Sequence, residues 1–397
     1  MGLYSPIPVI VIPMISIGTS ILIFTYLHFP LEKDRILSID GLRGYLALGV
    51  FIEHSANWYL YRKTGLWLPL KSNLYQSLGN IGIMFFFMIT GFLFWSRLIR
   101  DENTSLDWVK LYIARLLRLT PLYFFVVSII LLIVFIKTHF IIREKISSLL
   151  TEIFQWYSFT IGGRPNINGL KDTSIICGVV WTLPYEWLFY ISLPFMGLFF
   201  RKHNQYLSSL IALIGIIFLY IVMHLSKDVW FSYSPQLLSA FLGGIFVAYI
   251  VKLKASEILK NSFFSWISIL ILCLIFYLTT DPWNTIGIIA CSFIFLVIAS
   301  GNSFFGILTL KSSRVLGEIS YSIYLIHPLL LFSLFEFLMP QKTPIRPTTH
   351  WLSIFLLIPF LILCCYFTYT KIEYPFIKLT GRVNSFIRGI IGDRRKP

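Results

Sequence analysis

Long apolar runs recur along almost the whole chain, and they constrain its fold more than any other feature. Of its 397 residues, 57% are hydrophobic and only 13% are charged, and the mean hydropathy is +0.77. A helix needs about 20 apolar residues to cross a bilayer. Runs of roughly this length fall at 6–29, 41–60, 79–98, 119–137, 175–200, 207–225, 234–252, 263–280, 284–300, 318–338 and 350–371. The sequence therefore predicts an all-α, polytopic integral membrane protein with about eleven transmembrane helices.

The distribution of Lys and Arg predicts how these helices are oriented. The chain has 33 Lys and Arg against 18 Asp and Glu, a formal net charge of +15, and most of the basic residues flank apolar runs. About two thirds of them lie in loops that face the cytoplasm when the N-terminus is outside, as the positive-inside rule requires. We therefore expect an outside N-terminus, a cytoplasmic C-terminus and a long outer loop at 138–174. Because topology explains the positive charge, the expected partner is the lipid bilayer and not a nucleic acid.

Cysteine usage gives no sign of a metal centre. The five cysteines mostly lie inside apolar runs, and none forms a C-x-x-C pair. We interpret them as small core residues, so the sequence predicts neither a metal site nor a set of disulfides.

The segment from residue 35 to residue 54, RILSIDGLRGYLALGVFIEH, holds the first candidate for chemistry. Arg43 and His54 are eleven residues apart, which returns to nearly the same helix face after a rise of roughly 16 Å. An ionisable group in the bilayer is costly and marks a functional site by default, so we expect one cavity to join Arg43 to His54. The alternative is a histidine that only bonds a neighbouring helix. Glu53 should point about 100° away from His54.

A second candidate is the pair Arg115 and Arg118 in the segment RLLRLTP. Three residues apart, their side chains lie on one helix face at the expected cytoplasmic boundary. Two forked guanidinium groups there can hold a ligand that carries phosphates. The alternative is that both are ordinary topology anchors.

Two further segments place polar side chains inside apolar runs. Glu186 lies in WTLPYEWLFY, where it is either an acid/base or sugar-binding group, or the partner of a buried arginine. Tyr321, Tyr324 and His327 follow one another on adjacent turns of LGEISYSIYLIHP. For His327 a structural hydrogen bond between helices is favoured over catalysis.

Five motifs in this order resemble the signature blocks of the acyltransferase-3 family, the integral-membrane O-acyltransferases that modify surface and secreted glycans. They are ILSIDGLRG with His54, GNIGIMFFFMITGFLF, RLLRLTP, WTLPYEWLFY and LGEISYSIYLIHP. The resemblance covers about residues 35 to 375. It divides the chain into an extra N-terminal transmembrane helix at 1–34, the acyltransferase membrane domain at 35–375 and a basic cytoplasmic tail at 376–397.

The resemblance implies a function and assigns roles to residues. The donor would be an acyl-CoA, with acetyl-CoA the commonest among relatives, and the acceptor a hydroxyl of a saccharide such as lipopolysaccharide O-antigen or an exopolysaccharide. It implies catalytic roles for His54, Arg43 and Glu186, and donor binding by Arg115, Arg118 and Arg43. The expected location is the bacterial inner membrane.

Other membrane functions stay open at this point. A chain with buried His and Glu could be a transporter or flippase of a lipid-linked glycan, or a glycan polymerase that uses polyprenyl-linked sugars. Because a short basic tail follows the last apolar run, we expect no hydrolase-like domain after it. We therefore expect either direct transfer to the acceptor or a separate periplasmic transferase as partner.

Overall fold

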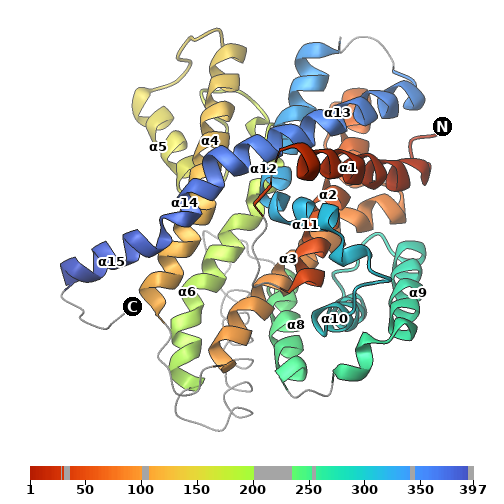
Figure 1. The fold of residues 1–397 in the computed structure, drawn as a ribbon. Helices are drawn as coiled ribbons and strands as arrows, with labels where there is room; N and C mark the ends of the chain where they lie inside the picture. The colour runs from red at the N-terminus through yellow and green to blue at the C-terminus, as the bar shows by residue number, and fades with distance from the viewer. Residues whose placement is uncertain are drawn as a thin grey trace.

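The computed structural model describes residues 1–27, 29–30, 36–100, 107–200, 235–252, 256–339 and 345–391. Over these residues the chain forms helices and no strand, which confirms the all-α prediction there (Figure 1). The α-helices are α1 (Ile7–Tyr26), α2 (Leu37–Thr64), α3 (Asn73–Arg100), α4 (Trp108–Lys137), α5 (Ile146–Tyr157), α6 (Leu183–Phe200), α8 (Pro235–Lys252), α9 (Ser262–Leu278), α10 (Thr285–Ala299), α11 (Lys311–Glu318), α12 (Ser320–Ser333), α13 (Pro347–Thr368), α14 (Tyr374–Lys378) and α15 (Thr380–Ile391).

Five helical stretches of the described chain are long and apolar enough to cross a membrane. They are Ile7–Tyr26, Asn73–Ile99, Trp108–Lys137, Ser320–Leu338 and Pro347–Ile390. Helices α8, α9 and α10 are apolar but shorter. Helix α2 is not in this set, and it carries charged side chains along its whole length, from Asp40 and Arg43 to Arg62 and Lys63. The membrane class is supported, but the count of eleven spans is not confirmed, and the predicted span at 207–225 lies outside the described residues.

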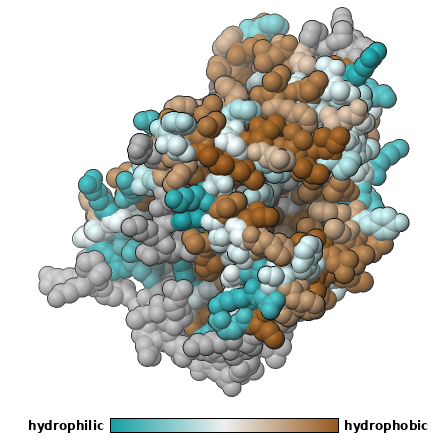
Figure 2. Space-filling view, turned by 45° about the vertical axis from the view of Figure 1, so that its right-hand side comes forward, coloured by the Kyte–Doolittle hydropathy of each residue, from teal (hydrophilic) through white to brown (hydrophobic). Residues whose placement is uncertain are grey.

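The outer surface is strongly apolar. Figure 2 shows hydrophobic side chains over much of one face. Large apolar side chains on several helices are strongly exposed, for example Ile286 at 80% and Leu356 at 81% exposure. Contiguous apolar surface on this scale is stable against lipid and not against water.

Helix α2 lies at the centre of the packing. It contacts α3, α11 and α12 most closely, and also α1, α10 and α13. Its buried face carries polar groups that a lipid-facing helix could not hold, among them Asp40, Glu53 and Asn57. The surrounding helices therefore shield the polar side chains of α2 from the bilayer.

The segment between α4 and α6 is more ordered than the sequence analysis expected. The outer loop predicted at 138–174 contains α5, so it is not a plain loop. The apolar run predicted at 175–200 is broken: a 3₁₀ turn spans Gly178–Thr182 before α6 begins at Leu183.

The first and last described helices, α1 and α15, pack onto other helices of the chain (Figure 1). Helix α1 lies along α13, where the Trp351 indole N–H donates to the carbonyl of Leu3 at 3.1 Å. Helix α15 packs on α4 through an ion pair of 2.6 Å between Arg388 and Asp107. The proposed division at residues 34 and 375 stays a prediction.

Helices α3 and α8 approach each other unusually closely because glycines lie between them. A Cβ atom at Gly244 would lie 2.0 Å from the carbonyl oxygen of Met88, and one at Gly91 would lie 2.3 Å from that of Phe241. Small residues allow such backbone contact between membrane helices, where dispersion replaces the hydrophobic effect as the driving force.

We predict that Gly244→Leu separates α3 from α8 and destabilises the protein by about 1–3 kcal/mol, as overpacking does. Thermal unfolding in detergent measures the effect. Gly18→Ala in α1 is the matched control, because no atom lies within 4 Å of its added Cβ. Equal stability of the two variants would contradict the close packing of α3 on α8.

Candidate functional site

Four of the side chains singled out in the sequence meet in one narrow cavity. Arg43 from α2, Arg115 and Arg118 from α4, and Glu186 from α6 line a cavity of about 90 Å³, which we call the arginine cavity. Their convergence places three positive charges and one negative charge in a small, largely apolar space. Arg43, Arg115 and Arg118 all act electrostatically on the Glu186 carboxyl.

The arginine cavity presents polar groups that the described residues do not satisfy. The Arg115 guanidinium lies over the Phe94 ring, 4.9 Å from its centre, in a cation–π contact. Arg118 is buried, and its Nη2 has no hydrogen-bond partner among the described residues. The buried hydroxyl of Ser320, also in the lining, likewise has none there. Buried donors of this kind are costly unless a ligand or water accepts from them.

Glu186 is held within the same cavity, away from the histidine of α2. The Tyr190 hydroxyl, one helical turn later, donates to its Oε2 at 2.8 Å. The structure thus places Glu186 in the same cavity as the arginines, and its role stays a prediction.

His54 lines a different and larger cavity. This cavity of about 470 Å³, which we call the tryptophan cavity, has His54 and Trp58 from α2, Trp67 from the α2–α3 connection, and Trp181 in its lining. The Trp67 ring meets His54 edge-on, with ring centres 5.6 Å apart. Arg164, Asp172 and Ser174 from the segment between α5 and α6 add polar groups to the lining.

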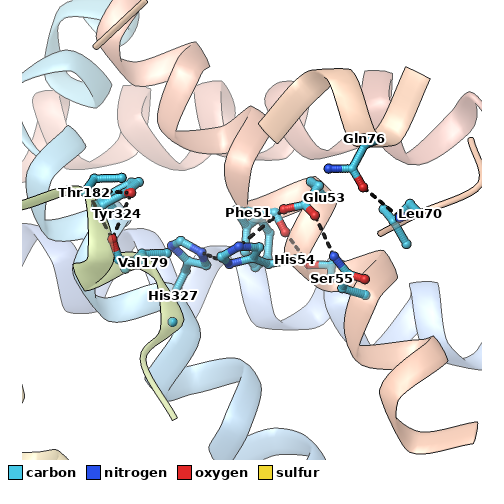
Figure 3. A network of polar contacts seen from close by, with 12 residues as sticks. Phe51, Glu53, His54, Ser55, Leu70, Gln76, Val179, Thr182, Tyr324 and His327 are labelled. Atoms are coloured by element: carbon cyan, nitrogen blue, oxygen red, sulfur yellow. Dashed lines mark hydrogen bonds and ion pairs between the residues drawn. The ribbon is translucent and has the colours of Figure 1, made fainter. Parts of the chain in front are cut away.

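His54 is part of a chain of hydrogen bonds that fixes its tautomer (Figure 3). Its Nδ1 lies 3.0 Å from Nε2 of His327, and Nδ1 of His327 lies 2.8 Å from the carbonyl oxygen of Ile323. A carbonyl can only accept, so Nδ1 of His327 carries a proton and its Nε2 accepts when the ring is neutral. His54 therefore donates through Nδ1 and keeps the lone pair of Nε2.

The predicted direction of the Glu53 side chain is wrong. Its carboxylate does not point away from the imidazole, because Oε2 lies 3.3 Å from Nε2 of His54. Oε1 accepts from the Asn57 amide at 2.5 Å. Gly79 of α3 leaves room for this conformation, since a Cβ there would come within 3.0 Å of the carboxylate. The flexible side chain thus overrides the angle set by the helix.

The two cavities meet at a wall, so the expectation of one cavity lined by both Arg43 and His54 is not met. Thr182 and Tyr324 belong to the lining of the arginine cavity. Their hydroxyls lie 3.0 Å apart, and the Tyr324 hydroxyl donates to the Val179 carbonyl at 3.1 Å (Figure 3). The adjacent residues Trp181 and Thr182 of the 3₁₀ turn thus line different cavities, and we call the hydrogen-bonded contact between Thr182 and Tyr324 of α12 the wall.

The sequence predicted a hydrogen bond between helices for His327, and its contact with His54 confirms this prediction. A buried acid, Glu373, was missed. Glu373 lies in a π-helical turn, Tyr369–Glu373, buried and hydrogen-bonded by Ser322. No spacing rule marked it. The described residues contain no group of three His, Cys, Asp or Glu that could hold a metal ion.

Comparison with known proteins gives consistent matches. A family model described as "Acyltransferase domain" matches residues 36–370. O-acetyltransferase OatA of Staphylococcus aureus (strain NCTC 8325 / PS 47) is 25% identical over 325 residues, covering 74% of this chain and 50% of that protein. A protein of strain COL with a provisional O-acetyltransferase name is 26% identical over 384 residues, covering 87% and 58%. The chain thus spans about half the length of these relatives, and no solved structure matches it significantly.

We predict that the two cavities open on opposite sides of the membrane. In a background without native cysteines, Arg43→Cys should react with a membrane-impermeant thiol reagent only from the cytoplasmic side, and His54→Cys only from the outside. Leu48→Cys, between them on α2 and fully buried, should react from neither side. Labelling of positions 43 and 54 from the same side would contradict the arrangement.

Proposed function

Because the chain belongs to the acyltransferase family whose model matches it, we propose that it is a membrane O-acetyltransferase. It would move an acetyl group from acetyl-CoA to a hydroxyl of a surface or secreted saccharide, such as lipopolysaccharide O-antigen or an exopolysaccharide. The observation that carries this proposal is the pair of cavities along α2, one rich in arginine and one containing His54. The O-acetyltransferase names of the relatives support acetyl as the group that is transferred.

The arginine cavity suits the donor. Coenzyme A has a heavily phosphorylated head and a long, thin arm that ends in the thioester. A cavity of about 90 Å³ is smaller than the 300–1,000 Å³ typical of ligand pockets, so the head would stay at its mouth while the arm enters. Arg115, Arg118 and Arg43 would hold the phosphates through charge-assisted hydrogen bonds. The unsatisfied Nη2 of Arg118 supports this assignment.

The tryptophan cavity suits the acceptor. Apolar faces of a sugar ring can pack on the indoles of Trp58, Trp67 and Trp181, while hydroxyls bond to Arg164 and Asp172 at polar positions of the lining. The loop that supplies Arg164 and Asp172 is on the outer side in the topology set by Lys and Arg. The acceptor would thus approach from the outside, in the bacterial inner membrane, with an outside N-terminus and a cytoplasmic C-terminus. A separate periplasmic transferase could pass the group onward.

The chemistry centres on Nε2 of His54. Its lone pair would take the proton of the acceptor hydroxyl as that oxygen attacks the thioester carbonyl. The carbon–sulfur bond then breaks, and the departing sulfur takes up a proton to give free coenzyme A. A covalent acetyl-imidazole on the same nitrogen is the alternative route. In either case the donor arm must pass the Thr182–Tyr324 wall, so this contact would open during turnover.

We predict that His54→Ala abolishes transfer while the protein still folds and inserts. The variant lacks Nε2, the ring nitrogen whose lone pair would accept the proton of the acceptor hydroxyl. Mass spectrometry of surface glycans from cells that carry the wild type or the variant measures the outcome. The wild type should add about 42 Da, the mass of an acetyl group, per modified sugar. Normal glycan modification by the variant would refute the mechanism.

We predict that Arg115→Ala and Arg118→Ala mainly weaken donor binding. Loss of one charge-assisted hydrogen bond of about 1.5–3 kcal/mol corresponds to a roughly 10- to 100-fold lower affinity. Binding of radiolabelled acetyl-CoA to purified protein is the measurement. Lys371→Ala, a basic residue that is not in the lining of the arginine cavity, is the control and should keep wild-type affinity. A wild type that does not bind acetyl-CoA would favour a transporter or polymerase instead.

A further inference from the structure

Glu53 is an acidic side chain in direct contact with the proposed base, with Oε2 3.3 Å from Nε2 of His54, and the mechanism above does not use it. We propose that Glu53 is a positioning residue that holds the proton taken up by His54 and stabilises the imidazolium formed during acetyl transfer. This inference rests on the proposed function and adds a residue that neither the sequence motifs nor the relatives assign.

Contacts from α2 and from α3 hold the Glu53 side chain in place. Its side chain is buried, with only 7% of the residue exposed. Asn57, one turn further along α2, donates to Oε1 at 2.5 Å, and Gly79 of α3 packs against the carboxylate without a side chain of its own. These contacts leave Oε2 directed at Nε2 of His54, 3.3 Å away. A carboxylate held in this way is already oriented before a substrate arrives.

The number of protons shared by Glu53 and His54 decides whether their contact is favourable. His327 is fixed by the Ile323 carbonyl, so it accepts the proton on Nδ1 of His54 and leaves Nε2 without one. An ionised carboxylate and a bare Nε2 are both acceptors, so their contact becomes favourable only when one proton lies between them. The acceptor hydroxyl supplies that proton during attack on the thioester.

The resulting imidazolium would then face a carboxylate on Nε2 and a neutral imidazole on Nδ1. Opposite charge at this distance in a low-dielectric site favours the charged product of proton transfer. When the carbon–sulfur bond breaks, the proton passes from the Glu53–His54 pair to the coenzyme A sulfur, and the pair returns to its starting state. No other reactant is required.

Other charged groups near the pair are less well placed for this role. Arg164 and Asp172 line the same cavity, but no ion pair within 4.0 Å links either of them to His54. Nε2 of His350 on α13 is hydrogen-bonded to the carbonyl oxygen of Ser55, 2.9 Å away. Among the described groups, Glu53 is therefore the acid that can act directly on His54.

The test is Glu53→Gln, which keeps the size and the hydrogen bond from Asn57 but removes the charge. In proteoliposomes with acetyl-CoA and an accepting glycan, kcat should fall about 100-fold, while the KM for acetyl-CoA changes less than twofold. Glu53→Asp retains the charge at a greater distance and should recover at least tenfold of this loss. A role confined to packing would leave Glu53→Gln as active as the wild type.

Glu336→Gln is the matched control. Glu336 is a largely buried acid paired with Lys137, and it is not in the lining of either cavity. Its kcat should stay within twofold of the wild type.

The outcomes separate this inference from the proposed function. Inactive wild-type protein would refute the proposed function itself. An active wild type with Glu53→Gln within threefold of its kcat would overturn the role of Glu53 alone. If Glu53→Gln fails to fold, Asn57→Ala is the deciding variant, because it removes the hydrogen bond to Oε1 of Glu53 and keeps the carboxyl group. The kcat of Asn57→Ala should fall about tenfold. An unchanged kcat would overturn the inference.

Discussion

The hydrogen bond between two imidazoles, His54 on α2 and His327 on α12, is the contact on which the candidate site depends. It joins residues that are 273 positions apart in the chain. Because the Ile323 carbonyl fixes the proton of His327, the same contact decides which nitrogen of His54 is free. Without it, the lone pair of His54 would have no defined direction.

Helix α2 can carry such groups only because other helices surround it. Polar and ionisable side chains in a membrane are costly unless they face a protein interior or a wet cavity. Arg43 near its start and His54 eleven residues later each face a cavity, and Glu53 is satisfied by Asn57. The exposed surface of α9, α10 and α13 is apolar in contrast. The burial of α2 and the exposure of the apolar helices both follow from the high cost of placing polar side chains in lipid.

Much of the arrangement was predictable from the sequence. Hydropathy predicted an all-α membrane protein, since a run of apolar residues carries its own signal. The spacing of Arg115 and Arg118 put both on one helix face, and the apolar surroundings of Glu186 required it to face a cavity. The structure brings all three together with Arg43.

The remaining features depend on contacts between distant segments. The His54–His327 bond, the Thr182–Tyr324 wall and the tryptophan cavity each join residues more than 100 positions apart. Glu53 was misplaced because helix geometry gives the direction of a Cβ and not of a carboxylate three bonds further out. The contact between the 3₁₀ turn before α6 and α12 mattered most, because Trp181 and Thr182 of this turn line different cavities.

The central claim is that a donor held by the arginines on one side of the wall brings its thioester to Nε2 of His54 on the other side, where the acceptor hydroxyl attacks it. A cryo-EM structure of the protein in lipid nanodiscs with a non-hydrolysable acetyl-CoA analogue tests it most directly. The account predicts phosphates against Arg115 and Arg118, a displaced Tyr324, and the acetyl carbonyl beside Nε2 of His54. An analogue that enters through the tryptophan cavity, or whose acyl end turns away from His54, would contradict it.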